Sequence, residues 1–261
     1  MAAVQISFTQ PGVAQVLMDR PAVFNAFDEQ MIAELDDAFT RLSDDTQVRV
    51  IVLAGSGKHF SAGADLQWMQ RAAAADHAWN LADARRFAAM LSRIDKCPKP
   101  TVAAIQGAAL GGGVGLACAC DIAIASMSAS FSVSEARFGI LPAVIGPYVV
   151  NAVGLRQARR LALSTTRVGA EEALRIGLVQ QIVAPDRLDS VVQAMATELL
   201  QAGPQAQGEI KSLFAQLEVG PTTEEVQELT ASVIARVRGS DEAREGFAAF
   251  LGKRPANWIP R

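Results

Sequence analysis

The chain has 261 residues, 50% of them hydrophobic, and a formal net charge of -3. This length suits one α/β domain with an appended helical tail, and so apolar a composition can fill a large core. The negative charge balance argues against nucleic acid or an anionic membrane as the main partner, so an anionic ligand must be held by local features.

Alternating apolar and polar residues near the start of the chain indicate a strand rather than a signal segment. The predicted strands are residues 4–8, 13–18, 48–54, 101–106 and 122–126. No uncharged apolar run is long enough for a membrane helix. Cys97, Cys118 and Cys120 have no disulfide-framework spacing, which favours free thiols in a reducing compartment. We therefore expect a soluble, cytoplasmic protein.

Helical patterns lie between the predicted strands. Asp28 is a candidate N-cap for the first helix, and a second apolar stripe from Leu81 to Ile94 ends at Pro98. This alternation of strands and helices predicts α/β layering with parallel crossovers.

After about residue 153 the pattern is mostly helical. Asp186 precedes one helical stripe, and Thr222 followed by Glu225 predicts a capping box at the start of another. The stripe Leu229, Val233 and Val237 on that helix is a candidate packing surface between subunits, with packing inside the chain as the alternative.

Several common catalytic motifs are missing. The glycines at 111, 112, 113 and 115 do not have the G-x-G-x-x-G spacing of a dinucleotide loop. The Gly55-Ser-Gly-Lys58 turn lacks the hydroxyl that a P-loop places on magnesium. His59 and His77 are the only histidines, so neither a metal site nor a histidine-dependent triad is expected.

Two glycine-rich turns are the strongest candidates for chemistry. One is His59-Phe-Ser-Ala-Gly-Ala-Asp-Leu66, and the other is Gly107-Ala-Ala-Leu-Gly-Gly-Gly-Val-Gly115. Each follows a predicted strand and opens a predicted helix, where free backbone N–H groups can meet a ligand. Two such turns converging on one carbonyl oxygen would form an oxyanion hole. The alternative is that the glycines only permit tight packing.

The order of motifs along the chain resembles the crotonase (enoyl-CoA hydratase/isomerase) family. The segments that carry the resemblance are Phe60-Ser-Ala-Gly-Ala-Asp-Leu66, Gln106-Gly-Ala-Ala-Leu-Gly-Gly-Gly113, Cys120-Asp-Ile122, Arg20-Pro-Ala-Val-Phe-Asn-Ala26, Gly169-Ala-Glu-Glu-Ala-Leu-Arg-Ile-Gly-Leu-Val179 and Phe250-Leu-Gly-Lys-Arg254. The resemblance implies an α/β fold, with a core of stacked ββα turns at residues 1–195 and a helical oligomerisation region at 196–261. It also implies a homotrimer or a hexamer built from two trimers.

The same resemblance assigns expected roles to individual residues. The oxyanion-hole amides fall on Ala64 and Gly112, and Glu135 is the catalytic acid or base. The residues expected to bind CoA are Val23, Ala26, Ala62, Asp65 and Leu66, joined by Phe250 and Lys253 from a neighbouring subunit. CoA is part of the substrate, so no separate cofactor is expected.

Gly115 departs from the family pattern, because hydratases of this family carry a first glutamate at that position. A buried Glu135 with a raised pKa could then act alone as acid or base, or it could simply pair with Arg137. The segments at 113–117, 134–143 and 146–150 resemble bacterial hydratases of branched glutaconyl-CoA esters, of the 3-methylglutaconyl and isohexenylglutaconyl types. Two rival functions stay open: an enoyl-CoA isomerase with one glutamate, and a non-catalytic acyl-CoA-binding protein.

Overall fold

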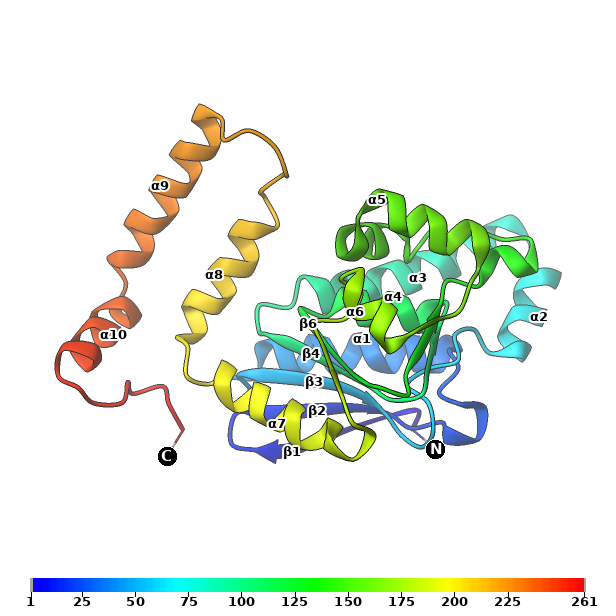
Figure 1. The fold of residues 1–261 in the computed structure, drawn as a ribbon, viewed down its shortest axis with the longest axis horizontal. Coiled ribbons are helices and arrows are strands. Elements are labelled where there is room, and N and C mark those ends of the chain that lie inside the picture. Colours follow the sequence, from blue (N-terminus) through cyan, green and yellow to red (C-terminus); the bar gives the residue numbers. More distant parts are fainter. Residues whose placement is uncertain (1, 261) are drawn as a thin grey trace.

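The computed structural model describes residues 2–260 as an α/β core with a helical arm (Figure 1). A six-stranded sheet forms the centre of the core, in the order β1-β2-β3-β4-β6-β9. Its strands are β1 (Val4–Gln10), β2 (Val13–Met18), β3 (Val50–Gly55), β4 (Thr101–Ile105), β6 (Ile122–Ser126) and β9 (Gln181–Val183). β1 and β2 pair antiparallel, and each later neighbour pairs parallel. The strands predicted from apolar runs are therefore confirmed.

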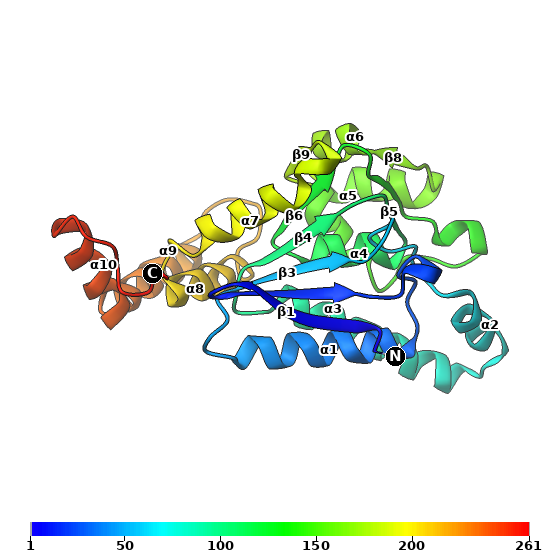
Figure 2. The same cartoon turned by 90° about the horizontal axis from the view of Figure 1, so that it is seen from below.

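Helices cover both faces of this sheet. On one face, the main apolar core involves α1 (Glu29–Asp44), α3 (His77–Asp95), α4 (Gly112–Ala119) and α5 (Gly146–Ser164). On the other face, α7 (Leu188–Leu199) packs over β3, β4 and β6, as Figure 2 shows from below. Within residues 2–260, no helix is long and apolar enough to cross a membrane.

A second sheet has three strands, and its first two strands pair in parallel as their neighbours in the first sheet do. Its strands are β5 (Ala108–Leu110), β7 (Ser130–Ser132) and β8 (Val168–Gly169), in that order, and the short helix α6 (Ala170–Arg175) follows β8. β4 pairs with β6 in the large sheet while β5 pairs with β7 in the small one, so successive strand–strand–helix units lie on top of one another. This is the expected stack of ββα turns.

The helix starts agree with the sequence at Asp28 and differ by one residue at Thr222, and the helix expected after Asp186 begins at Leu188. Asp28 caps α1 by accepting a hydrogen bond from the Met31 N–H at 2.9 Å. The cap of α9 (Glu224–Arg238) is Thr223, whose hydroxyl accepts from the Val226 N–H, so the capping box predicted at Thr222 is wrong by one residue. A 3-10 turn at Pro185–Arg187 leads into α7, whose start has no side-chain cap.

The C-terminal arm stands apart from the core. It contains α8 (Pro204–Phe214), α9 and α10 (Asp241–Leu251), and α8 and α9 run side by side (Figure 1). The last sheet-packing helix, α7, continues to Leu199, four residues beyond the expected core boundary at 195. Arg49 attaches the arm by donating to the carbonyls of Trp258 at 2.9 Å and Ala202 at 2.7 Å.

Candidate active site

The two glycine-rich turns lie side by side because a backbone bridge joins their first residues. The Ser61 N–H donates to the Ala108 carbonyl at 3.1 Å, and the Leu110 N–H donates to the Ser61 carbonyl at 2.9 Å. Ser61 is fully buried, and its hydroxyl donates to the carbonyl of Asn25 at 2.8 Å. The convergence of these turns, expected from the sequence, is therefore present in the structure.

The amide of Ala64 is presented by a second bridge. The Phe27 N–H donates to the Gly63 carbonyl at 2.7 Å, and the Asp65 N–H donates to the Phe27 carbonyl at 2.8 Å. In a parallel bridge of this kind the central residue directs its own N–H to the opposite side. Within residues 2–260 the Ala64 N–H has no acceptor, and Ala64 is exposed. This amide is free to meet a ligand oxygen.

Gly112 supplies the second amide. It is the first residue of α4, where a backbone N–H has no acceptor inside the helix. A Cβ at this position would lie 2.8 Å from Cε2 of Phe27 and 3.0 Å from Cζ of Phe87. Close packing therefore requires glycine here, as the alternative reading of the glycines held, and no described residue accepts the hydrogen bond of its N–H.

Glu135 lies beside this helix start. It begins a 3-10 turn (Glu135–Phe138) after β7, and its Oε1 would be 3.2 Å from a Cβ on Gly111. Its Oε2 is buried without a hydrogen-bond partner among the described residues. Burial raises the pKa of the Glu135 carboxyl from its ordinary value of 4.5, although backbone hydrogen bonds partly oppose the shift. A carboxyl with a raised pKa and one unpaired oxygen can serve as a general acid or base.

Arg137 is not the partner of Glu135. Its Nε donates to Oγ1 of Thr165 at 2.8 Å, at the end of α5. The salt-bridging interpretation of Glu135 therefore receives no support from the structure.

The position where the family carries its first glutamate is filled by an apolar side chain. A Cβ on Gly115 would lie 2.3 Å from Cγ2 of Ile145 and 2.9 Å from its Cβ. Ile145 is 2% exposed and immediately precedes α5, so its place is fixed by the start of that helix. Position 115 therefore offers no carboxylate to pair with Glu135, and Ile145 occupies the space where its side chain would begin.

The residues expected to bind the CoA portion lie in two neighbouring loops. Val23 ends a 3-10 turn (Pro21–Val23), and the Ala62 N–H donates to the carbonyl of Phe24 at 2.9 Å, which joins the loops. Leu66 opens α2 (Leu66–Ala74) and is 75% exposed, whereas Ala26 is buried. Val23 and Leu66 thus stand at the surface around the free Ala64 amide.

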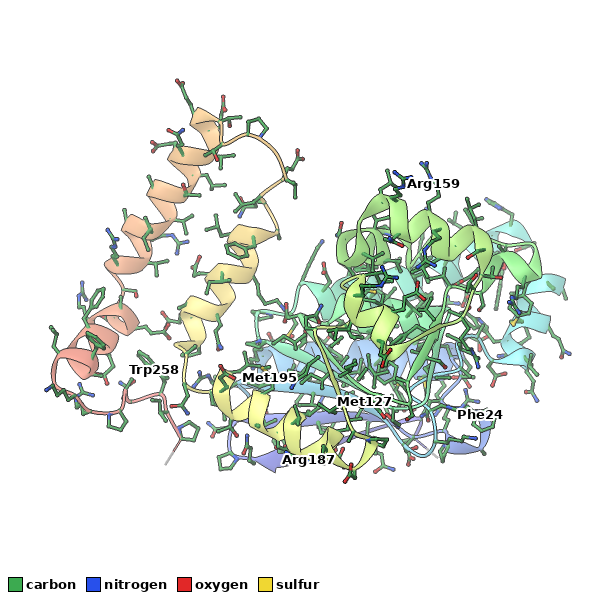
Figure 3. The ribbon with its side chains drawn as sticks, viewed as in Figure 1. Phe24, Met127, Arg159, Arg187, Met195 and Trp258 are labelled. Atoms are coloured by element: carbon green, nitrogen blue, oxygen red, sulfur yellow. The ribbon has the colours of Figure 1, made fainter. Side chains whose placement is uncertain are left out.

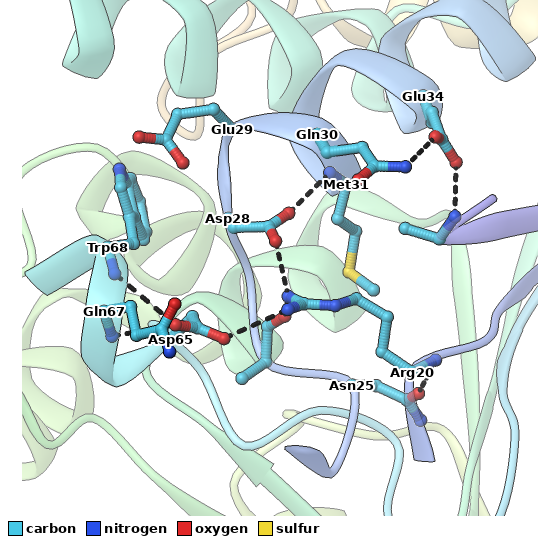
Figure 4. A network of polar contacts seen from close by, with 12 residues as sticks. Arg20, Asn25, Asp28, Glu29, Gln30, Met31, Glu34, Asp65, Gln67 and Trp68 are labelled. Atoms are coloured by element: carbon cyan, nitrogen blue, oxygen red, sulfur yellow. Dashed lines mark hydrogen bonds and ion pairs between the residues drawn. The ribbon is translucent and has the colours of Figure 1, made fainter. Parts of the chain in front are cut away.

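The Asp65 carboxylate is occupied within the chain. One oxygen accepts the N–H groups of Gln67 and Trp68 and caps α2. The other lies 3.2 Å from Arg20, whose guanidinium also pairs with Asp28 at 2.9 Å (Figure 4). These contacts of the Asp65 carboxylate fix the loop that carries Ala64.

Phe250 and Lys253 are not brought to this site within one chain. Phe250 lies on α10 and is 82% exposed, at the far end of the arm from α2 in both ribbon views (Figures 1 and 2). Figure 3 shows the same separation between Phe24, beside the CoA-binding loop, and Trp258 on the arm. The binding of CoA by Phe250 and Lys253 from a neighbouring subunit stays a prediction.

The contacts of three structurally important residues were not predicted from the sequence. Arg20 joins the two loops, Phe27 contacts both free amides' surroundings, and Ile145 fills the space at Gly115. Arg20 belongs to a motif already quoted, so its charge beside two aspartates was a usable signal. Nothing in the sequence places Ile145 on Gly115.

Two free amides beside a carboxyl with one oxygen that has no partner among the described residues form a site suited to stabilising an oxyanion while moving a proton. Comparison with known proteins specifies the class further. The family profile described as enoyl-CoA hydratase/isomerase matches residues 9–261. The chain is 34% identical over 257 residues to the crotonyl-CoA hydratase of Syntrophomonas wolfei. The aligned region covers 95% of each of the two chains.

Solved structures agree with this family. An enoyl-CoA hydratase from Shewanella pealeana is 42% identical, with a TM-score of 0.94 over 98% of this chain and 96% of its own. An enoyl-CoA hydratase/isomerase from Marinobacter aquaeolei is 32% identical, with a TM-score of 0.93 over 100% of both chains. The chain belongs to the enoyl-CoA hydratase/isomerase family, also called the crotonase family. It is an enzyme of the hydro-lyase type.

Proposed function

We propose that this enzyme hydrates a branched enoyl-CoA thioester with an alkyl group on the β-carbon, of the 3-methylglutaconyl or isohexenylglutaconyl type. Such substrates belong to leucine breakdown and to acyclic terpene breakdown. The alternative within the family is an enoyl-CoA isomerase, and the alternative outside it is an acyl-CoA-binding protein without catalysis.

In the proposed reaction one carboxylate handles the proton in both directions. Ionised Glu135 takes a proton from water as the water oxygen bonds to the β-carbon. The π electrons of the double bond move toward the thioester oxygen, which becomes an enolate oxygen held by the N–H groups of Ala64 and Gly112. The protonated Glu135 then returns its proton to the α-carbon, and the carbon–oxygen double bond reforms. Water is consumed and Glu135 is restored.

The observation that carries the choice of substrate is the contact between Ile145 and Gly115. Apolar atoms stand where a second carboxylate would begin, at 2.3 Å from the Cβ position. A β-alkyl group stabilises partial positive charge on the β-carbon when the two amides polarise the double bond ahead of C–O bond formation, and for such a transition state a branched substrate needs less help from a second base.

Heavy-oxygen water tests hydration against isomerisation directly. Incubation of a 3-methylglutaconyl-CoA ester with enzyme in heavy-oxygen water should give a product that gains the labelled oxygen by mass spectrometry. Isomerisation would shift the double bond without any labelled oxygen entering the product. A panel that includes crotonyl-CoA then tests the branch, because we expect kcat/KM to favour the β-alkyl esters. Equal or better turnover of crotonyl-CoA would overturn the proposed substrate class.

The arm suggests how the site is completed. We propose a homotrimer or a dimer of trimers in which α10 of one chain reaches the CoA site of the next. Supporting this, Phe247, Phe250 and Leu251 on α10 are 57%, 82% and 79% exposed. Leaving such a cluster in water is unfavourable, and grouped exposed apolar residues commonly mark an interface. A monodisperse monomer in light scattering would contradict this assembly.

A further inference from the structure

Phe27 contacts the surroundings of both free amides. Its backbone N–H and carbonyl pair with Gly63 and Asp65, the residues on either side of Ala64, at 2.7 and 2.8 Å. Because both neighbours of Ala64 are held by one residue, the direction of the Ala64 N–H follows the position of the Phe27 backbone.

The ring of the same residue packs on the second amide's helix. Its Cε2 and Cδ2 would lie 2.8 and 3.1 Å from a Cβ on Gly112, so the ring rests directly on the Gly112 backbone. Phe87 backs this ring, with centroids 5.7 Å apart, and Trp68 meets Phe87 edge-on at 6.3 Å. Phe27 is 1% exposed, so its ring has no freedom to move aside.

We propose that Phe27 is a positioning residue that sets the spacing between the Ala64 and Gly112 N–H groups. This inference rests on the proposed function, in which those amides form the oxyanion hole. The Ser61 bridge holds the first residues of the two turns together, three positions before each amide. Phe27 holds the amides themselves, through its backbone on one side and its ring on the other. Phe27 does not touch the reacting atoms.

The spacing matters because an oxyanion hole acts by preorganisation. Donors aimed at the developing charge need no rearrangement during the reaction, and a misplacement of about 1 Å can cost about 100-fold in rate. A side chain that only fills the core would lower stability when trimmed and leave turnover per folded enzyme unchanged. When a positioning side chain is trimmed, kcat must fall while KM stays nearly constant, because the enolate forms only during the reaction.

The test compares Phe27→Leu with the matched control Phe39→Leu. Phe39 is also fully buried in the main core but lies on α1, away from both turns. We expect both variants to lose comparable thermal stability. Only Phe27→Leu should lose kcat, by about 10- to 100-fold, with KM within about twofold. Equal kcat losses in the two variants, or none in Phe27→Leu, would overturn the inference. Phe27→Met, which better conserves volume, replaces Phe27→Leu if that variant does not fold.

A coupling experiment adds a readout that loss of packing cannot mimic. Gly112→Ala places a methyl group where the Phe27 ring now lies, so this single variant should have a reduced kcat. Combined with Phe27→Leu, the methyl group gains space, and the double variant should have a higher kcat than Gly112→Ala. Additive losses in the double variant would show that the ring and Gly112 act independently, which contradicts the inference.

Infrared spectroscopy separates this inference from the function on which it rests. A saturated CoA thioester labelled with carbon-13 at its carbonyl reports hydrogen bonding through its stretching frequency. In the unmodified enzyme the two amides should lower that frequency on binding, and Phe27→Leu should reverse part of the shift. No shift in the unmodified enzyme would count against the oxyanion hole itself. A full shift retained in Phe27→Leu would count against Phe27 alone.

Discussion

The side chain of Ile145 rests on Gly115 so closely that position 115 has no room for a side chain. A Cβ there would be 2.3 Å from Cγ2 of Ile145, well inside van der Waals contact. Restoring the family's first glutamate by Gly115→Glu alone should therefore give an overpacked protein, less stable by about 1–3 kcal/mol, rather than a working second base. Thermal unfolding of the variant checks this. A variant as stable as the parent would show that Ile145 moves aside freely.

Removing the obstruction gives the informative experiment. Gly115→Glu combined with Ile145→Gly removes both atoms that obstruct position 115, and this pair should gain hydration of crotonyl-CoA relative to Ile145→Gly alone. The comparison isolates the glutamate side chain, because both proteins carry the same change at position 145. A folded double variant with no gain would indicate that the missing glutamate does not limit activity on unbranched esters.

Glu135→Gln should reduce turnover by about 10²–10⁴, as expected for a positioned acid–base group. Exposed Glu171→Gln is the matched control and should change nothing. Full activity in Glu135→Gln would remove this residue from the mechanism.

The same variant should be more stable than the parent at neutral pH. The pKa of Glu135 is raised by burial, so the carboxyl's contribution to stability is fully present at pH below its ordinary value and is lost as pH rises through the raised value. Neutral glutamine avoids that loss. Melting temperatures measured across pH should diverge above about 4.5 and converge below it. A variant less stable than the parent at pH 7 would contradict the buried-charge account.

The pH profile of kcat/KM should show an acid limb above the ordinary carboxyl range. The reaction begins with ionised Glu135, so activity is lost as pH falls through its raised pKa. His59 is the competing explanation, because its Nδ1 accepts the Ala108 N–H at 3.0 Å and burial lowers its pKa. His59→Asn keeps an acceptor at that place and should retain the limb. Loss of the limb in His59→Asn would assign it to the histidine.

Ala64→Pro should reduce kcat by about 10²–10³, the usual cost of one oxyanion donor, because proline has no N–H. Ala64→Ser retains the N–H and is the matched control, with kcat within a few-fold of the parent. Since position 64 is exposed and follows Gly63, both variants should remain folded. Comparable kcat values for the proline and serine variants would exclude this amide as a donor.

The sequence predicted the sheet and both turns because their signals are local. Short apolar runs mark the strands, with polar residues alternating in the first of them, and the glycines mark the strand-to-helix turns. The cap was misplaced because only Thr222 has a glutamate three residues further on, at Glu225, whereas the residue that caps the helix is Thr223. The contacts of Ile145 with Gly115 and of Phe27 with Gly112 join distant segments, and no periodicity reports which side chains meet across the core.

The site was predicted where family motifs coincide with backbone features. Ala64 and Gly112 lie in glycine-rich turns whose order could be read directly. Asp65 shows the limit of such reading, since its carboxylate holds Arg20 and caps α2 rather than facing outward. The arm's distance from the site was likewise not available from the sequence, because it depends on how α8 leaves the core.

The central claim is that Ala64 and Gly112 hold the thioester oxygen beside Glu135. A crystal structure with a bound, unreactive CoA thioester tests it most directly. The account predicts the thioester oxygen about 2.7–3.1 Å from both backbone nitrogens, with Oε2 of Glu135 facing the α- and β-carbons. A thioester oxygen beyond hydrogen-bond range of both amides, in a fully occupied site, would contradict it.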